Sequence, residues 1–486
     1  MSSIKKLAGQ TAIYGLPSIL GRLLNFLLVP LHTAAMTRGE FGIITDLYSQ
    51  IAVLIVLLTY GMETSFFNYA SESKSASKAF GAGMRALVFT TLCFYLLFEI
   101  FQSPIAEVLR YENHPEYLRM MILVLCLDVI SALPFAKLRF EERAIRFVVV
   151  KMSLIGVFIL MNFFFFIALP NLPALTEFWP ALQKVDRVSA VLISNVVASL
   201  VMFAMLLPEW RIKGGWKRDS PLLKKMIGYG FPLMLAGLAG IANELADRQF
   251  LKYLLPEDTS LEQLGVYGAV YKLSIFLMLF VQAYRYAMEP FFFRMKKEAS
   301  SGETNAEVLR LFTALLGLAL IFLNAAMPVL KGFIDEKFWI GLSIAPLLFA
   351  ANYILGINTH LSIWYKLAGR TYFALIITLA GLLVTVILNI WLIPKYGIMA
   401  SAIATLFSYA CSMSLNLYLG NKYAPLPYQW KHLSIYFFGS LLLGFFAWKM
   451  QETMGLWALI TLAPYLILLY FFEQKSIQLI WKKINA

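Results

Sequence analysis

A succession of long apolar segments constrains the fold of this chain more than any other feature of its sequence. An apolar helix of about 20 residues, rising ~1.5 Å per residue, is long enough to cross a ~30 Å hydrocarbon core. The segments occupy residues 11–33, 42–62, 82–102, 118–136, 147–169, 189–208, 229–250, 265–287, 308–329, 340–362, 373–393, 398–419, 433–449 and 456–472. They predict an all-α polytopic membrane protein with about 14 transmembrane helices.

The composition supports the same class. Charged residues make up 14% of the chain and hydrophobic residues 60%, whereas a soluble chain carries roughly 25% charged residues. The cysteines lie inside apolar segments, which favours packing roles over a disulfide or a metal site; they are Cys93, Cys126 and Cys411.

The formal net charge of +13 has a topological meaning in such a protein, because Lys and Arg accumulate in cytoplasmic connections. Basic clusters recur in alternate connections, at residues 137–146, 211–225, 294–297 and 475–483. We therefore expect a multi-pass protein of the cell inner (cytoplasmic) membrane with both termini in the cytoplasm. We also expect contacts with anionic lipid head groups and no nucleic-acid partner.

Two short signals recur in the same order and indicate an internal duplication. Tyr14-Gly15-Leu16-Pro17 opens the first apolar segment, and Tyr229-Gly230-Phe231-Pro232 opens the seventh. Gly-Glu-Phe-Gly at 39–42 and Gly-Val-Tyr-Gly at 265–268 open the second and eighth. Six helices per half make this a parallel repeat about an axis along the membrane normal. We predict an N-terminal six-helix lobe at 1–208, a basic cytoplasmic linker at 209–228, a C-terminal six-helix lobe at 229–420, and an additional C-terminal helix pair with a cytoplasmic tail at 421–486.

Three stretches of the sequence resemble a known family. They are Lys5-Lys6-Leu7-Ala8 with the Tyr-Gly-x-Pro helix, Asp247-Arg248 with the Gly-Val-Tyr-Gly element, and WLIPKYGIMASAIAT at 391–405. Together they resemble the polysaccharide transporter family, of the O-antigen flippase type, in the multidrug/oligosaccharidyl-lipid/polysaccharide exporter superfamily. The resemblance implies two pseudo-symmetric six-helix bundles around a central cavity that opens alternately to each side, with a lipid-linked oligosaccharide as cargo. The final helix pair also resembles the lipid II flippase branch.

Arg22 stands at the middle of the first apolar segment. A charge at that depth costs about 2.5 to 3.5 kcal/mol unless it faces protein or water. Polar residues at helical spacing form one stripe with it, which predicts that this helix lines a water-filled cavity; they are Thr11, Tyr14, Ser18, Asn25 and His32. Arg22 would bind the pyrophosphate of the cargo there. Pairing with a carboxylate of a neighbouring helix is the alternative.

The eighth apolar segment carries a second polar stripe, with Tyr271, Gln282 and Arg285 among its members. Lys272 has no carboxylate within one helical turn, so we predict that it also binds cargo, with snorkelling to the membrane surface as the alternative. The predicted cargo-binding residues are Arg22, Asn25, Ser18, Lys272, Tyr271 and Gln282.

Charged residues near helix ends are candidate gates. Glu244 and Arg248 have i,i+4 spacing, and so do Arg285 and Glu289, which equally fits plain intrahelical ion pairs. Asp46 could pair with Arg22 or Arg248 or take a coupling proton, or it could be a solvated helix end. The gate or ion-pair candidates are Asp46, Glu244, Asp247, Arg248, Arg285 and Glu289.

Asp128 and Glu99 are carboxylates in otherwise apolar segments. They are the candidates for proton or cation coupling, with pairing to a neighbour or an interface position as the alternative. His32 and His360 have the positions typical of interface histidines, and a proton relay is their second interpretation.

No G-x-x-x-x-G-K-[ST], H-E-x-x-H or C-x-x-C motif occurs, so we expect a transporter with no catalytic residues, no ATPase, no metal and no cofactor. The membrane potential would help drive it, because each negative charge moving outward gains about 2.3 kcal/mol per 100 mV. We predict a flippase that translocates a polyprenyl-pyrophosphate-linked oligosaccharide across the cytoplasmic membrane by alternating access, for cell-surface polysaccharide or lipopolysaccharide biosynthesis.

The alternatives are a lipid II flippase, a cation-coupled drug exporter of the same superfamily, and a membrane glycosyltransferase. A drug exporter would favour a carboxylate-rich cavity, and a glycosyltransferase would need a large loop outside the membrane. Predicted partners are the lipid-linked oligosaccharide, membrane lipids and other polysaccharide-assembly membrane proteins.

Overall fold

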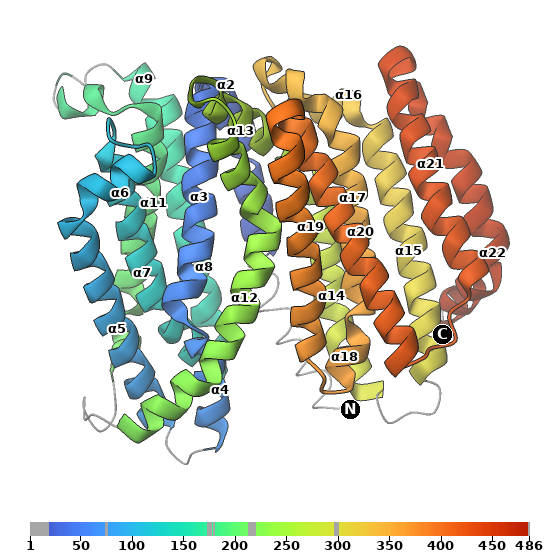
Figure 1. Cartoon of the computed structure of the whole chain (residues 1–486), viewed down its shortest axis with the longest axis horizontal. Coiled ribbons are helices and arrows are strands. Elements are labelled where there is room, and N and C mark those ends of the chain that lie inside the picture. The colour runs from blue at the N-terminus through green and yellow to red at the C-terminus, as the bar shows by residue number, and fades with distance from the viewer. Residues whose placement is uncertain are drawn as a thin grey trace. The chain divides into compact units, whose positions relative to one another are not determined.

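The computed structural model describes residues 19–72, 76–172, 177, 180–211, 220–295 and 301–484, and every regular element in these ranges is a helix (Figure 1). Eleven helices in the described ranges are long and apolar enough to cross a membrane, or up to 12 if the bent pair Glu257–Lys272 and Ile275–Tyr286 is one span. A shorter apolar helix covers Ile19–Ala35. The predicted all-α polytopic membrane fold is confirmed, and the count of about 14 helices remains a prediction.

The chain forms two compact units, Met1–Gln249 (unit 1) and Phe250–Ala486 (unit 2). The boundary between them lies inside the long helix α12 (Ser220–Leu254). The domain limits that we placed at 208, 228 and 420, and the internal repeat, remain predictions. Each unit is described below by itself.

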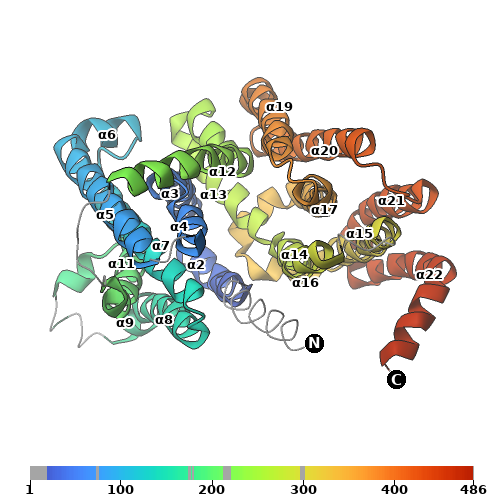
Figure 2. The ribbon, with the colours of Figure 1, turned by 90° about the horizontal axis from the view of Figure 1, so that it is seen from below.

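Unit 1 is a helical bundle organised around α7 (Pro115–Phe140), whose most apolar window is 72% buried. Helix α7 packs against α3 (Arg38–Thr59), α5 (Ala76–Ile100) and α11 (Arg187–Leu206), and α11 also packs against α8 (Ala144–Phe163). Figure 2, which looks along the helices, shows α5, α7 and α11 as neighbours. The remaining described elements of this unit are α2 (Val29–Ala35), α4 (Met62–Glu72), α6 (Gln102–Val108), a π-helical turn (Phe164–Ala168), α9 (Leu169–Asn171), two 3-10 helices (Pro180–Lys184 and Leu207–Trp210) and most of α12.

Local sequence signals set the ends of α3. Thr37 and Glu40 form a capping box, in which each side chain accepts a hydrogen bond from the backbone N–H of the other residue. At the other end, Tyr60 and Gly61 adopt left-handed conformations with φ of 34° and 70°. These residues separate α3 from α4, and they lie against the backbone of Gly230 in α12. The sequence Tyr229-Gly230-Phe231-Pro232 therefore supplies a position with no side chain at a close contact between two backbones.

Unit 2 is organised around α17 (Ala345–Leu361), which packs against α14 (Ile275–Met295), α15 (Ser301–Ala325) and α20 (Ile398–Tyr423). The chain bends by 51° between α13 (Glu257–Lys272) and α14. The remaining described elements of this unit before residue 430 are α16 (Met327–Leu330), two 3-10 helices (Lys331–Phe333 and Glu336–Ile344), α18 (Ile363–Leu367) and α19 (Tyr372–Tyr396).

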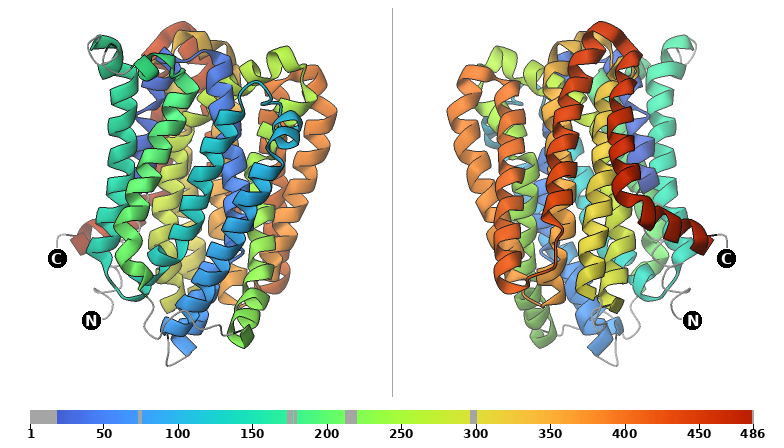
Figure 3. Two further views of the ribbon diagram at one scale, coloured as in Figure 1. Left: turned by 90° about the vertical axis from the view of Figure 1, so that its left-hand side faces the viewer. Right: turned by 90° about the vertical axis from the view of Figure 1, so that its right-hand side faces the viewer.

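The C-terminal helices α21 (Trp430–Met454) and α22 (Leu462–Ile484) pack on α15. They are joined by a 3-10 turn that begins at Gly455, whose φ of 57° favours glycine. The right-hand view of Figure 3 shows the two helices side by side and joined at one end. Their contact with α15 includes Ala314, Ile321, Tyr436 and Tyr465, all fully buried.

Candidate functional site

The first described helix places Arg22 and Asn25 on an exposed face. Among the residues that the structure describes, none forms an ion pair with the Arg22 guanidinium. His32, which we predicted on the same stripe, is instead buried, and its Nε2 lies 2.7 Å from Oδ1 of Asn162 in unit 1. The polar stripe therefore splits, because His32 packs inside unit 1 while Arg22 and Asn25 remain exposed. Ser18, Thr11 and Tyr14 lie outside the described residues.

Asp46 of α3 is fully buried rather than solvated at a helix end. Its carboxylate accepts hydrogen bonds from the Tyr111 hydroxyl at 2.7 Å, from Gln50 at 2.8 Å and from Gln249 of α12 at 2.8 Å. Three donors on one carboxylate offset much of the cost of removing a charge from water. Asp46 therefore connects α3, the segment before α7, and α12 inside unit 1.

Asp128 lies at the contact between α7 and α11. Its Oδ1 accepts a hydrogen bond of 3.0 Å from the Ser199 hydroxyl, and it interacts electrostatically with Lys151 of α8. One turn away on α11, the Asn195 amide donates to the Tyr48 hydroxyl at 3.3 Å. A carboxylate, an amide and two hydroxyls thus lie close together where α3, α7 and α11 meet in unit 1.

Glu99 has a different environment, close to the end of α5. Arg119 donates to its carboxylate at 3.2 Å, and the same guanidinium donates to Gln102 at 2.7 Å. The Arg119 side chain is 57% exposed. An exposed ion pair of this kind is worth little to stability. Glu99 thus lies near the end of its helix beside an exposed arginine, whereas Asp128 lies within α7.

The i,i+4 spacing of Glu244 and Arg248 in α12 fitted either an intrahelical ion pair or a gate, and the structure shows no ion pair between these two side chains. Arg248 pairs instead with Asp247, both of them buried, and also donates to the backbone carbonyl of Glu244 at 2.6 Å. The Glu244 side chain is exposed, with no ion partner among the described residues. The i,i+4 spacing identified the turn of α12 that holds the ion pair. The partner of Arg248 in that turn is the buried Asp247 and not the exposed Glu244.

In unit 2, Lys272 is the last residue of α13 and is exposed, immediately before the 51° bend. Tyr271 is half-buried with its ring 6.1 Å from that of Tyr267. Gln282 of α14 is buried, and its amide donates to the Tyr286 hydroxyl at 3.3 Å. Arg285 is exposed, with its guanidinium 5.9 Å from the centre of the Tyr286 ring. The side chain of Glu289 lies outside the described residues, so its pairing with Arg285 remains a prediction.

Sequence reasoning missed two buried polar networks. Glu209, only 3% exposed, accepts from Arg143 at one end of unit 1; this hydrogen bond raises the pKa of Arg143, although burial opposes the rise. In unit 2, His360 is buried between the Tyr284 hydroxyl and Asn305, whose Oδ1 lies 3.1 Å from its Nε2. Neither set has a regular spacing in the sequence, so no local signal could have found them.

The sequence profile of the family described as "Polysaccharide biosynthesis protein" matches residues 7–296, which is more than half of the chain. The chain belongs to this polysaccharide biosynthesis protein family. The match confirms the resemblance that the sequence motifs indicated. No curated protein sequence matches the chain significantly.

Solved structures give this family member the same fold as known membrane transporters. The lipid II flippase MurJ in an inward closed conformation has a TM-score of 0.73 at 14% identity, covering 96% of this chain and 99% of that one. An inward-facing multidrug resistance MATE family transporter of the MOP superfamily has a TM-score of 0.62 at 12% identity, covering 87% and 94%. The Vibrio cholerae MATE transporter VcmN in the bent form has a TM-score of 0.56 at 14% identity, covering 91% and 99%. These likenesses establish the fold.

The part of this polysaccharide biosynthesis protein that matches the family profile ends shortly after α14. It contains every residue that we predicted to bind cargo, form a gate or couple transport. The helices from α15 to α22 lie beyond it, including the C-terminal pair.

Proposed function

We propose that this protein is a flippase that translocates a polyprenyl-pyrophosphate-linked oligosaccharide across the cytoplasmic membrane by alternating access. The family supports a role in polysaccharide biosynthesis. The fold, shared with a lipid II flippase and with MATE transporters, supports transport of a membrane-soluble molecule. Such a cargo has an anionic head, a polar glycan and an apolar tail, and only the head requires fixed positive charge.

The observation that carries the proposal is the exposure of basic side chains within apolar helices. Arg22 and Arg285 are exposed. Arg22 lies in the short apolar helix Ile19–Ala35, and Arg285 lies in the bent pair Glu257–Lys272 and Ile275–Tyr286, which together are apolar enough to cross a membrane. Asp46 and Asp247, in contrast, are buried and hydrogen-bonded or paired. A cation left exposed at bilayer depth is costly unless water or an anion reaches it. A pyrophosphate head group provides that anion and accepts charge-assisted hydrogen bonds from Arg.

We assign the coupling role to Asp128. Its carboxyl group can be protonated or ionised, and the ionised form is stabilised by the Ser199 hydroxyl and by the positive charge of Lys151. The membrane potential adds to the driving force. An outward-moving head group gains about 2.3 kcal/mol per charge per 100 mV. We infer that both termini are cytoplasmic from the basic clusters that recur in alternate connections of the sequence.

A lipid II flippase is the second candidate function, and the extent of the fold match to MurJ favours it. The two cargoes share the polyprenyl pyrophosphate and differ in the glycan. The cation-coupled drug exporter is less compatible, since a cationic drug would be repelled by Arg22, Lys272 and Arg285.

Proteoliposomes provide the test. The purified protein is reconstituted, and outward movement of a fluorescent polyprenyl-pyrophosphate oligosaccharide is compared with that of lipid II and of a cationic dye. Arg22→Ala should abolish movement of the oligosaccharide lipid, while Arg22→Lys should retain part of it because the charge remains. Arg119→Ala is the matched control, since it removes an exposed arginine that pairs with Glu99.

Equal transport by Arg22→Ala and the unchanged protein would overturn the role of Arg22. Transport of lipid II but not of the oligosaccharide lipid would favour the second function. Transport of the dye alone would replace both with drug export.

A further inference from the structure

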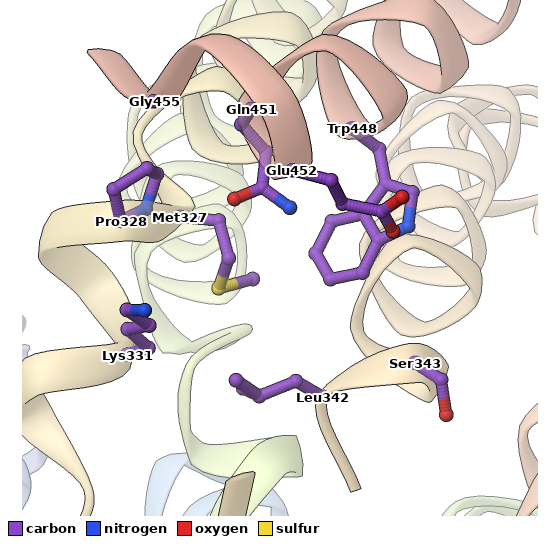
Figure 4. A pocket seen from close by; sticks show the side chains of 9 residues that line it. All are labelled: Met327, Pro328, Lys331, Leu342, Ser343, Trp448, Gln451, Glu452 and Gly455. Atoms are coloured by element: carbon purple, nitrogen blue, oxygen red, sulfur yellow. The ribbon is translucent and has the colours of Figure 1, made fainter. Parts of the chain in front are cut away.

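A pocket of about 520 Å³ opens in unit 2 where α21 ends near α16 and the 3-10 helix Glu336–Ile344 (Figure 4). Its volume falls in the ~300–1,000 Å³ range of small-ligand sites. Met327, Leu342 and Trp448 form apolar parts of its wall, and Lys331, Gln451 and Glu452 add polar groups. No residue predicted to bind or gate the cargo lines it.

The position of the pocket along α21 places it at the level of lipid head groups. Earlier turns of α21 expose apolar side chains, among them Phe438, Leu442 and Phe445. The last two turns carry Lys449, Gln451 and Glu452. Because about 20 residues span the hydrocarbon core, the end of this 25-residue helix reaches the interface between hydrocarbon and water.

Exposed apolar side chains close to the pocket in sequence support this depth. Ile340 is 70% exposed and Trp457 is 74% exposed, and Val329 and Leu456 are also exposed. Tryptophan concentrates at membrane–water interfaces, where its ring contacts both phases. The opening of the pocket therefore lies where a lipid head group can reach it.

The pocket presents both signs of charge. Figure 4 shows Lys331 and Glu452 on opposite sides of it. The Lys331 ammonium lies 4.3 Å from the centre of the Trp339 ring, and no described carboxylate pairs with it. Glu452 pairs with Lys449 at 3.3 Å, but both side chains are about half exposed, so this pair is weak and can exchange for another cation.

We propose that this pocket binds the head group of a zwitterionic phospholipid that carries a primary ammonium. The phosphate binds Lys331 and the Gln451 amide, and the ammonium binds Glu452. Trp448, Met327 and Leu342 contact the apolar part of the lipid next to the head group. A neutral glycan would leave Lys331 and Glu452 without charged partners, whereas a zwitterion of this kind neutralises both.

Native mass spectrometry of the full chain in detergent tests the site. Phosphatidylethanolamine, phosphatidylglycerol and phosphatidylcholine are added separately, and the bound fraction is measured. We expect phosphatidylethanolamine to bind best. Lys331→Gln should weaken its binding about tenfold, the size expected for one lost hydrogen bond to a charged group, and should also weaken phosphatidylglycerol. Glu452→Gln should weaken phosphatidylethanolamine by a similar factor but leave phosphatidylglycerol unchanged.

Lys337→Gln and Glu336→Gln are matched controls, because they make the same charge changes in the neighbouring 3-10 helix outside the pocket lining. They should bind all three lipids as the unchanged protein does, and the unfolding temperatures of all four variants without lipid should agree. Three results would each overturn the proposal. These are equal binding of phosphatidylethanolamine and phosphatidylglycerol, equal losses in the controls, and displacement of the lipid by a soluble oligosaccharide.

Discussion

Arg310 of α15 and Glu473 of α22 form a buried ion pair, with Nη2 and Oε2 separated by 2.9 Å. The Tyr436 hydroxyl of α21 donates to the same carboxylate at 3.0 Å, and Arg310 also donates to Gln429. One charged pair therefore joins both C-terminal helices to the core of unit 2. A buried pair of this kind holds one arrangement of the helices, because any other arrangement leaves a charge without its partner.

Breaking this pair should destabilise the protein. Glu473→Gln removes the buried carboxylate that pairs with Arg310 and leaves the exposed Glu307 at 4.0 Å. Removing one partner of a buried pair costs about 3–5 kcal/mol in other proteins. We expect a clear fall in the free energy of unfolding in detergent and faster proteolysis of α22. The control is Glu307→Gln, since the Glu307 side chain is 50% exposed and lies 4.0 Å from Arg310. If both variants unfold alike, the ion pair does not hold the helix pair.

Gly230 should tolerate no side chain. A Cβ there would lie 2.6 Å from the Tyr60 carbonyl oxygen and 2.9 Å from Oγ of Ser65, so Gly230→Ala should cost about 1–3 kcal/mol. Gly228, two residues earlier in the same helix, has no atom within 4 Å of such a Cβ. Gly228→Ala should therefore stabilise α12 by about 0.5–1 kcal/mol. Thermal unfolding of both variants decides this, and a harmless Gly230→Ala would show that the two backbones can move apart.

Asp128→Asn should uncouple transport from a pH gradient. The amide keeps the size of the side chain and can still bond to Ser199, but it cannot ionise. In proteoliposomes with an imposed pH gradient, we expect the transport rate of this variant to become independent of the gradient. Glu99→Gln makes the same change at a carboxylate that pairs with Arg119 and should respond like the unchanged protein. A gradient response that survives Asp128→Asn would remove Asp128 from the coupling role.

The carboxyl group of Asp186 should make the free energy of unfolding fall at acidic pH. Burial by itself raises the pKa of this carboxyl, but hydrogen bonds from the Ser189 hydroxyl, the Ser189 backbone and the Tyr117 hydroxyl hold the pKa below its usual value. A pKa lowered by folding stabilises the protein above the pKa of the unfolded chain, and the effect is lost as the pH falls through the folded value.

The unchanged protein should therefore be more stable than Asp186→Asn at neutral pH, and the difference should shrink as the pH falls below about 4. Chemical unfolding at a series of pH values measures it. Glu112→Gln is the control, because Glu112 is an exposed carboxylate five residues before Tyr117 in the sequence. A difference that stays constant with pH would mean that Asp186 contributes as a helix cap without a change in its pKa.

Several features of this protein follow from its sequence because they depend on local properties. The bilayer requires long apolar helices, so the segments around residues 118–136 and 373–393 predict α7 and α19 directly. Thr37 and Glu40 are three residues apart, and that spacing is enough to form the capping box of α3. The family also follows from sequence motifs, which are read without knowing which helices touch.

Contacts between distant residues were decided by the tertiary structure. The sequence places Asp46 near the end of an apolar segment. In the structure, Tyr111 and Gln249 from other elements donate hydrogen bonds to its buried carboxylate. His32 has the helical spacing of Arg22, but its side chain is buried in unit 1, where its Nε2 lies 2.7 Å from Oδ1 of Asn162 in α8. Helical periodicity places a residue on a face and does not say what covers that face. The sequence alone determined the all-α membrane fold class and the family of this protein, because hydrophobicity acts within one segment and family motifs are read along the chain. Only the packing of helices decided which charges are neutralised and which stay exposed, because burial and pairing depend on partners up to about two hundred residues away.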